Sequence, residues 1–197
     1  MKKLILILLA AAGLVSTADA DSSFPDALMI ASTQTNYPVK TAYEQFARVP
    51  GAVLVGGWSR VGTLSDGVSF PVDVKVVRLT NMETSNHVYA IVLITSYPNY
   101  AQYDYIDSDE LDGFIHGTQL VSRIAHPISS TDDSAASYIT KGGFLIMKFS
   151  SGGNAVAQLK SARNQERNTL EASSLDKLTD LLNTAKANIQ GLIQNGG

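Results

Sequence analysis

The chain has 197 residues, of which 45% are hydrophobic and 17% are charged, a balance typical of a globular protein with a sizeable core. It contains no cysteine, which excludes disulfide bonds and thiol chemistry. Its formal net charge is −3 and it has no run of lysine and arginine, which argues against binding to nucleic acid or anionic lipid. We therefore expect one folded domain that is stabilised by packing alone and has no nucleic-acid partner.

The first twenty residues have the order of a secretory signal peptide. Lys2 and Lys3 precede the apolar run 4–15, and small residues surround a cleavage point after Ala20. The apolar run is shorter than the ~20 residues that a helix needs to span a bilayer. Removing two lysines and one aspartate with this leader changes the net charge to −4. We expect residues 1–20 to be a cleaved signal peptide and the mature chain to be secreted or periplasmic, with no membrane attachment.

Residues 21–40 are polar and aperiodic, which predicts a flexible N-terminal arm, with a short strand at 28–30 if that segment packs on the body. The folded domain is expected over 41–195, with halves 41–126 and 134–195. Four strands are predicted in the first half: 42–49, 52–64, 69–80 and 88–95.

Glycine and proline set the expected turns and bends of this half. Pro50–Gly51 favours a type II turn between the first two strands, and Gly56–Gly57 indicates a bulge in the second. Residues 69–80 alternate, with Phe70 on the same side as three valines, which indicates one buried face. Residues 88–95 are nearly all apolar, as expected of a central strand.

A helix follows the fourth strand. Asp107–Asp109 offer N-cap side chains, residues 111–125 repeat apolar side chains at helical spacing, and His126–Pro127 ends the pattern. The second half repeats this order, with strands at 136–140, 144–149, 155–161 and 169–172 and a helix from Ser173 or Ser174. The predicted fold is α+β, with two antiparallel β-meander-plus-helix halves and the helices packed on the sheets. The two helix openings align at an offset of 67 residues, through duplication or through convergence of two amphipathic helices.

Several landmarks resemble those of an uncharacterised bacterial protein family, which implies no activity. They are Phe46, 50–54, Val61–Gly62, 106–115 and 140–144. At the level of fold, two meander-plus-helix halves also resemble the Whirly-type single-stranded nucleic-acid binders. The leader and the acidic charge argue against carrying that function to this chain, because fold alone does not fix function.

An acidic run precedes and opens the first helix, and calcium binding is its obvious functional interpretation. Its members are Asp104, Asp107, Asp109, Glu110 and Asp112. Counted from Asp107, however, a calcium loop needs glycine at the sixth position and glutamate at the twelfth, where Asp112 and Thr118 stand. The acids are therefore expected to cap the helix and complement its dipole.

The three histidines, His87, His116 and His126, have no zinc-site spacing, so we expect no metal and no cofactor. Asp112 lies one turn before His116, and this pair is the weak catalytic candidate for a hydrolase. A serine in a nucleophile-elbow motif, which such a pair would activate, is missing from the sequence. An enzyme is therefore the less favoured interpretation.

Tyrosines crowd the connection after the fourth predicted strand. Tyr97, Tyr100, Tyr103 and Tyr105 are the candidate ligand-binding residues, because rigid rings offer contact area for sugar or protein at low entropic cost. Alternatively, Tyr103 and Tyr105 end an extended segment and pack on the sheet. Trp58 is expected in the core.

Two functions remain beside the hydrolase. The favoured one is a non-enzymatic binding or interaction module for an extracytoplasmic ligand or protein. The other is an architectural subunit whose sheet edges pair with a second copy, which would appear as a concentration-dependent dimer.

Overall fold

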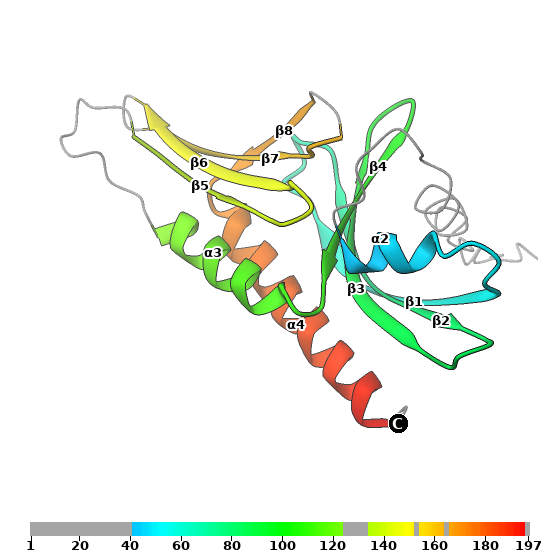
Figure 1. The fold of residues 1–197 in the computed structure, drawn as a ribbon. Coiled ribbons are helices and arrows are strands. Elements are labelled where there is room, and N and C mark those ends of the chain that lie inside the picture. Colours follow the sequence, from blue (N-terminus) through cyan, green and yellow to red (C-terminus); the bar gives the residue numbers. More distant parts are fainter. Residues whose placement is uncertain (1–40, 124–133, 152–153, 164–165, 196–197) are drawn as a thin grey trace, which may run out of the picture.

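The computed structural model describes residues 41–123, 134–151, 154–163 and 166–195. The predicted leader, the arm with its 28–30 segment, and the helix end at His126–Pro127 lie outside the described residues. Two four-stranded antiparallel sheets, each followed by a helix, form an α+β fold (Figure 1). The predicted fold class is confirmed.

The first sheet, sheet A, has the order β1-β2-β3-β4. Its strands are β1 (Leu54–Leu64), β2 (Val72–Asn81), β3 (His87–Ser96) and β4 (Ala101–Asp107). Side chains of β3 are buried on both faces, as predicted for a central strand: Ile91 lies in one hydrophobic cluster and Val92 in another. The predicted alternation in β2 is also confirmed, because Val72, Val74 and Val76 share the cluster of Ile91.

The first predicted strand, 42–49, is wrong. The segment forms the helix α2 (Ala42–Ala47), because Thr41 and Glu44 make a capping box. The Thr41 hydroxyl accepts from the Glu44 N–H at 3.1 Å, and the Glu44 carboxylate accepts from the Thr41 N–H at 3.3 Å. The fourth strand of sheet A is instead β4, which sequence analysis had treated as a tyrosine-rich connection.

The turn and the bulge predicted for the first half also differ from those in the structure. Pro50–Gly51 lies between α2 and β1 rather than between two strands, and Gly51 has the positive φ of 78° that a turn glycine allows. The irregularity in β1 falls between Arg60 and Gly62, not at Gly56–Gly57. The first error follows from the wrong assignment of 42–49, whereas the second arose because the glycine pair was taken as the site of the bulge.

The second sheet, sheet B, has the order β5-β6-β7-β8. Its strands are β5 (Ser134–Ile139), β6 (Leu145–Ser151), β7 (Asn154–Lys160) and β8 (Arg167–Glu171). The turn between β5 and β6 forms as predicted, with Gly143 at a φ of 85°. Its hairpin is closed by Gly143 and Phe144, whose N–H groups donate to the carbonyl and the hydroxyl of Thr140.

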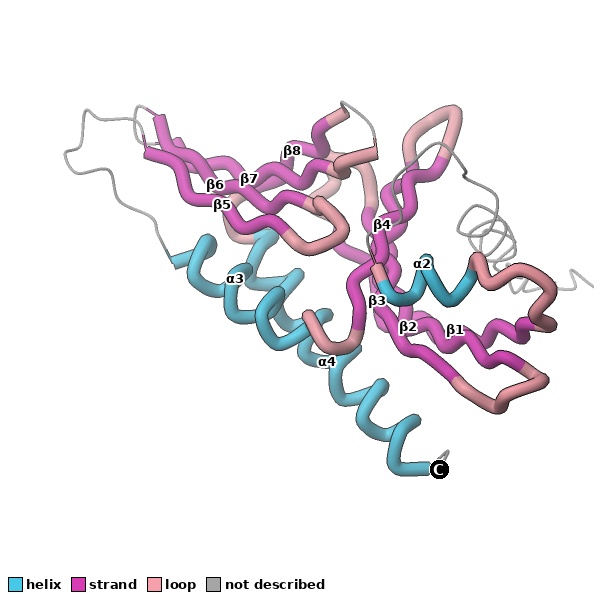
Figure 2. Tube along the Cα trace, viewed as in Figure 1, coloured by secondary structure: helices cyan, strands magenta, loops and turns pink. Residues whose placement is uncertain are grey.

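Each long helix covers the sheet of the other half. Helix α3 (Leu111–Arg123) follows sheet A but packs on β5 and β6, whereas α4 (Ser174–Asn195) follows sheet B but packs on β1 and β2. The two helices also pack on each other, and Figures 1 and 2 show α3 beside the first part of α4 beneath sheet B, with the rest of α4 running away from that sheet. The apolar faces of α3, α4 and both sheets therefore form one continuous core.

A second, smaller core lies on the opposite face of sheet A, beneath α2. Tyr43 of α2 stacks on Tyr105 of β4 at a centroid separation of 4.9 Å. Asp107, at the end of β4, accepts from the N–H groups of Ala42 and Tyr43 at 2.7 and 3.0 Å. Its side chain thus caps the start of α2 rather than that of α3, the helix for which it was predicted as a cap.

Candidate functional site

Three aromatic rings meet where the β3–β4 hairpin approaches the start of β2. Tyr97 stacks on Tyr100 at 4.9 Å and meets Phe70 at 4.8 Å in a tilted contact. The Tyr97 N–H donates to the Tyr100 carbonyl at 2.9 Å, which closes the hairpin. Phe70 is 38% exposed and Tyr100 is 42% exposed, so ring surface stays open to solvent. We call Phe70, Tyr97 and Tyr100 the aromatic cluster.

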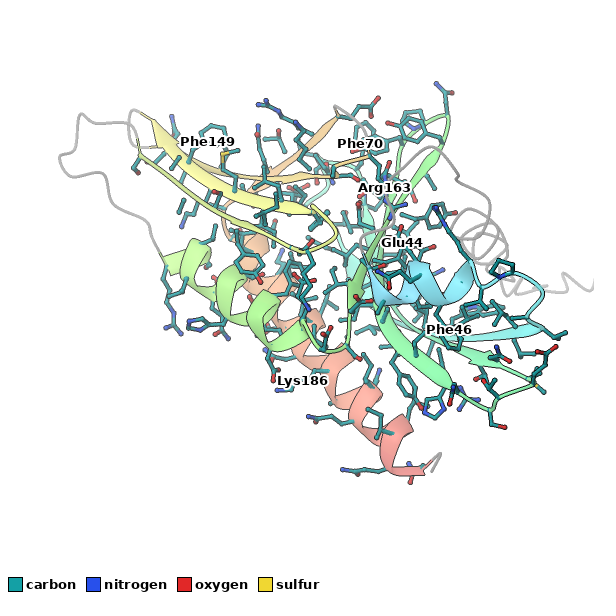
Figure 3. All side chains as sticks on the ribbon, viewed as in Figure 1. Glu44, Phe46, Phe70, Phe149, Arg163 and Lys186 are labelled. Carbon is teal, nitrogen blue, oxygen red and sulfur yellow. The ribbon has the colours of Figure 1, made fainter. Side chains whose placement is uncertain are left out.

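The aromatic cluster is tied to sheet B through Asn168 of β8. The buried Asn168 side chain accepts from the Phe70 N–H at 3.1 Å and donates to the Phe70 carbonyl at 2.7 Å. Nearby, Asp66 accepts from the Glu171 N–H at 3.0 Å. Hydrogen bonds between backbone groups and side chains therefore fix the segment that carries Phe70 to sheet B. Figure 3 shows Phe70 at the junction of the two sheets.

A group of buried polar side chains lies beneath this junction. Asp104 of β4 is 4% exposed and accepts from the Ser161 hydroxyl at 2.5 Å. The Ser161 oxygen in turn accepts from the Gln102 amide and the Arg163 N–H, both at 3.1 Å. Burial raises the pKa of Asp104 to about 6, with the Ser161 hydrogen bond and the Arg163 charge acting against the rise.

Arg163 links this group to α2. Its guanidinium forms an ion pair with Glu44 and lies over the Tyr105 ring, 5.7 Å from the centroid (Figure 3). Burial acts to raise the pKa of Glu44, but the charge of Arg163 and the hydrogen bonds from Arg163 and Thr41 outweigh it and leave the pKa lowered. We call Glu44, Asp104, Ser161 and Arg163 the inter-sheet polar cluster, because it joins α2, sheet A and sheet B.

The structure separates the four predicted tyrosines into two pairs. Tyr97 and Tyr100 lie in the aromatic cluster, whereas Tyr103 and Tyr105 are buried on the face of sheet A that α2 covers. Sequence reasoning missed Phe70, which it placed with the buried valines of β2. The signal was present, because Pro71 separates Phe70 from Val72, where the strand begins.

The candidate catalytic pair does not meet in a pocket. Asp112 is exposed on α3 and accepts a salt bridge from Lys186 of α4 at 2.6 Å. His116, one turn along, is exposed as well. Both side chains therefore lie on the solvent side of the helix. The hydrolase interpretation requires them to meet in a pocket.

The members of the acidic run do not converge on one site, although two of them share Lys141 as a partner. Asp109 pairs with the Lys141 ammonium at 3.0 Å, and Glu110 accepts from the Lys141 N–H at 2.5 Å. Among the described residues, no three His, Asp or Glu side chains are placed to hold a metal ion. Of the histidines, His87 makes an edge contact with Tyr89 at 5.2 Å, and His126 lies outside the described residues.

Trp58 is not in the core, contrary to expectation. It lies on β1, the edge strand of sheet A, and is 45% exposed. It borders a shallow depression of about 270 Å³ together with Arg78 of β2 and Leu192 of α4. The reason is positional: the indole lies on an edge strand, and the α4 residue that lines the depression beside it is Leu192, near the end of the helix.

No protein-family model, curated protein or solved structure matches the chain. The resemblance to an uncharacterised bacterial family therefore gains no support from these comparisons, and function has to be argued from the site itself. Within the described ranges, no helix is both long enough and apolar enough to cross a membrane.

Proposed function

We propose that the protein is a secreted or periplasmic binding module without enzymatic activity, and that the aromatic cluster is its ligand platform. The observation that carries this proposal is the contact of Phe70, Tyr97 and Tyr100, which brings three rings together with open surface at the seam of two sheets. The signal-peptide pattern predicted from the sequence of residues 1–20 supports the proposed location.

Rigidity supports a binding role for these rings. Aromatic side chains that are already stacked lose little further freedom when a ligand is added, so most of the contact energy remains available for affinity. The backbone that holds Phe70 is fixed by Asn168, and the backbone that holds the tyrosines is closed as a hairpin. The platform is therefore organised before any ligand arrives.

Charge indicates the kind of ligand. The Tyr97 phenol is neutral at physiological pH and can donate a hydrogen bond, and burial, followed by the negative charges of Glu166 and Asp104, raises its pKa further. The same two carboxylates disfavour an anionic ligand. Stacked rings beside hydrogen-bond donors suit the apolar face and hydroxyl groups of a neutral sugar. We therefore assign neutral oligosaccharides as the ligand class.

One further function is favoured by a specific observation. Strand β1 is an edge strand of sheet A and is exposed along most of its length, with Val55 and Trp58 among its exposed apolar residues. Long exposed edges favour strand pairing with another chain. A self-associating subunit that pairs through β1 is therefore the second candidate, and sedimentation velocity over a hundredfold range of protein concentration tests it.

The binding module is tested with the double variant Tyr97→Ala/Tyr100→Ala and three neutral probes: cellohexaose, maltohexaose and chitohexaose. We expect at least one probe to bind the native protein in calorimetric titrations and to bind the double variant at least tenfold more weakly. Leu120→Ala is the matched control, because Leu120 is an equally exposed apolar residue on α3.

Thermal unfolding of the same variants separates recognition from folding. Because Tyr100 is 42% exposed and Tyr97 is only half-buried, the double variant should unfold within a few degrees of the native protein. The proposal is wrong if none of the three probes binds, if the double variant binds as well as the native protein, or if it melts much lower. A much lower melting temperature would show that the two tyrosine rings stabilise the fold.

A further inference from the structure

Strand β1 presents a long open edge of sheet A. Its eleven residues pair with β2 on one side, and residues 57–60 in its middle are all exposed. Trp58, the one tryptophan of the chain, lies within this stretch. Unpaired N–H and C=O groups along an exposed edge are a template for a strand from another chain. The middle of β1 is therefore available for pairing.

The edges at β4 and β8 are tied to other segments. The Ser161 hydroxyl accepts from Gln102 of β4 and donates to Asp104 of the same strand. Asp66 accepts from the Glu171 N–H of β8 at 3.0 Å. Strand β5, the remaining edge, has six residues. Of the four edges in the described parts of the chain, β1 therefore offers the longest stretch to another strand.

Strand β1 also has little of the protection that edge strands usually carry. Natural edges are commonly blocked by lysine, proline or inward-pointing charge. Residues 54–64 contain neither lysine nor proline, and their one charged residue, Arg60, forms an ion pair with Asp73 of β2 at 2.9 Å. The register irregularity between Arg60 and Gly62 lies past the exposed stretch, so it leaves the residues up to Arg60 regular.

The middle of β1 is complementary to itself in antiparallel pairing about Trp58. In this register the facing pairs are Trp58 with Trp58, Gly57 with Ser59, and Gly56 with Arg60. Directly opposed side chains of paired strands interact, and aromatic pairs are favourable whereas like charges are unfavourable. Here two indole rings meet at the centre, and each arginine faces a glycine rather than another charge. This self-complementarity favours a second copy of the chain over an unrelated strand.

The face of β1 toward α4 has room for such a contact. Gly57 and Ser59 line the depression of about 270 Å³ together with Leu192. A methyl group added at Gly57 would meet no atom within 4 Å. A second strand beside β1 therefore meets no bulky side chain of β1 on this face.

We propose that β1 pairs antiparallel with β1 of a second copy about a two-fold axis at Trp58. The two four-stranded sheets A then form one continuous sheet of eight strands. A two-fold contact uses the same surface on both copies, so association stops at the dimer. This dimer gives a surface and a register to the self-associating subunit named above as the second candidate function, on which it rests.

The dimer leaves the aromatic cluster open. Phe70 stands seven residues before Val77, the β2 partner of Trp58, so the axis is roughly 20 Å from the cluster at ~3.3 Å per strand residue. Oligosaccharide binding and dimerisation are therefore separate properties, and each is measured without the other.

The test places opposite charges at the axis with Trp58→Glu and Trp58→Lys. In sedimentation velocity over a hundredfold concentration range, we expect the native protein to dimerise and each variant alone to dimerise at least roughly tenfold more weakly, because like charges then face each other. An equimolar mixture of the two variants should recover the dimer, because opposite charges meet. Leu120→Glu is the matched control, since Leu120 is equally exposed on α3 and its substitution should leave the dimer intact.

The native protein supplies a second readout. Because Trp58 is the one tryptophan, its fluorescence emission should shift to longer wavelength on dilution, as the indole leaves the axis for water. This measurement decides the matter if a variant does not fold.

A native protein that stays monomeric at every concentration would overturn both the interface and the self-associating subunit. Three results would overturn the interface alone and assign self-association to another surface. They are a native dimer whose emission does not change on dilution, Trp58 variants that dimerise as well as the native protein, and a mixture of folded variants that does not recover the dimer.

Discussion

Replacing Asp104 by asparagine should stabilise the protein at neutral pH and leave its stability unchanged in acid. The carboxyl group is buried in the inter-sheet polar cluster, where the Ser161 hydroxyl donates to it at 2.5 Å. Asparagine keeps an oxygen that accepts this hydrogen bond and has the shape of the protonated acid, but it cannot ionise. The substitution therefore removes the charge and little else.

The magnitude follows from the pKa. Burial raises the pKa of Asp104 from 3.8 to about 6, and at 1.36 kcal/mol per pH unit this corresponds to about 3 kcal/mol. Because the folded-state pKa lies above the unfolded value, protonation stabilises the fold fully below pH 3.8, and this contribution is lost as the pH rises to about 6. Above that pH, the native protein holds a charged carboxylate that Asp104→Asn lacks.

Urea unfolding between pH 3.5 and 8 measures the effect. The free energy of unfolding of Asp104→Asn should match that of the native protein near pH 3.5 and exceed it by about 3 kcal/mol at pH 7 and above. Asp112→Asn is the matched control, because Asp112 is exposed on α3 and its loss should change little at any pH. The reasoning is wrong if the difference in free energy of unfolding between Asp104→Asn and the native protein does not change with pH, or if the variant is less stable at pH 7. Either result would show that Arg163 compensates the buried charge fully.

The remaining substitutions test the packing and the capping of the helices. Gly117→Ala places a methyl group 2.2 Å from the Tyr138 ring, so α3 must shift away from sheet B, and the free energy of unfolding should fall by about 1–3 kcal/mol. Gly191→Ala adds a methyl group in open space on α4 and should raise the free energy of unfolding by about 0.4–1 kcal/mol. If urea unfolding finds Gly117→Ala as stable as the native protein, α3 does not pack on Tyr138 as described. Thr41→Ala removes the cap of α2 and should lower the free energy of unfolding by about 0.5–2 kcal/mol, while Thr41→Ser retains it; equal losses in both would contradict the capping box with Glu44.

Sequence patterns predicted the elements whose burial is regular along the chain. The central position of β3 followed from its apolar run, and the buried face of α3 followed from apolar residues at helical spacing. The segment 42–49 failed because it is short and its apolar residues fit either period. The Thr41–Glu44 capping box would have identified the helix.

The candidate site was less accessible to sequence reasoning. Tyr97 and Tyr100 were found because they are close in the chain, but Phe70 and Asn168 join them only through tertiary structure. The inter-sheet polar cluster unites residues from α2, β4 and the segment after β7, and no local spacing connects such distant positions. Hydrophobic periodicity indicates which face of a helix is buried, but it does not indicate which sheet that face meets.

The crossed placement of α3 and α4 has a consequence for how the chain acquires its shape. Sheet A is complete in sequence at Asp107, yet the helix that packs on β1 and β2 begins at Ser174. During synthesis from the N-terminus, the first half therefore waits with an uncovered apolar surface until the last residues arrive. Each half depends on the helix of the other to bury its sheet, so removing α4 would expose the apolar face of β1 and β2 to water.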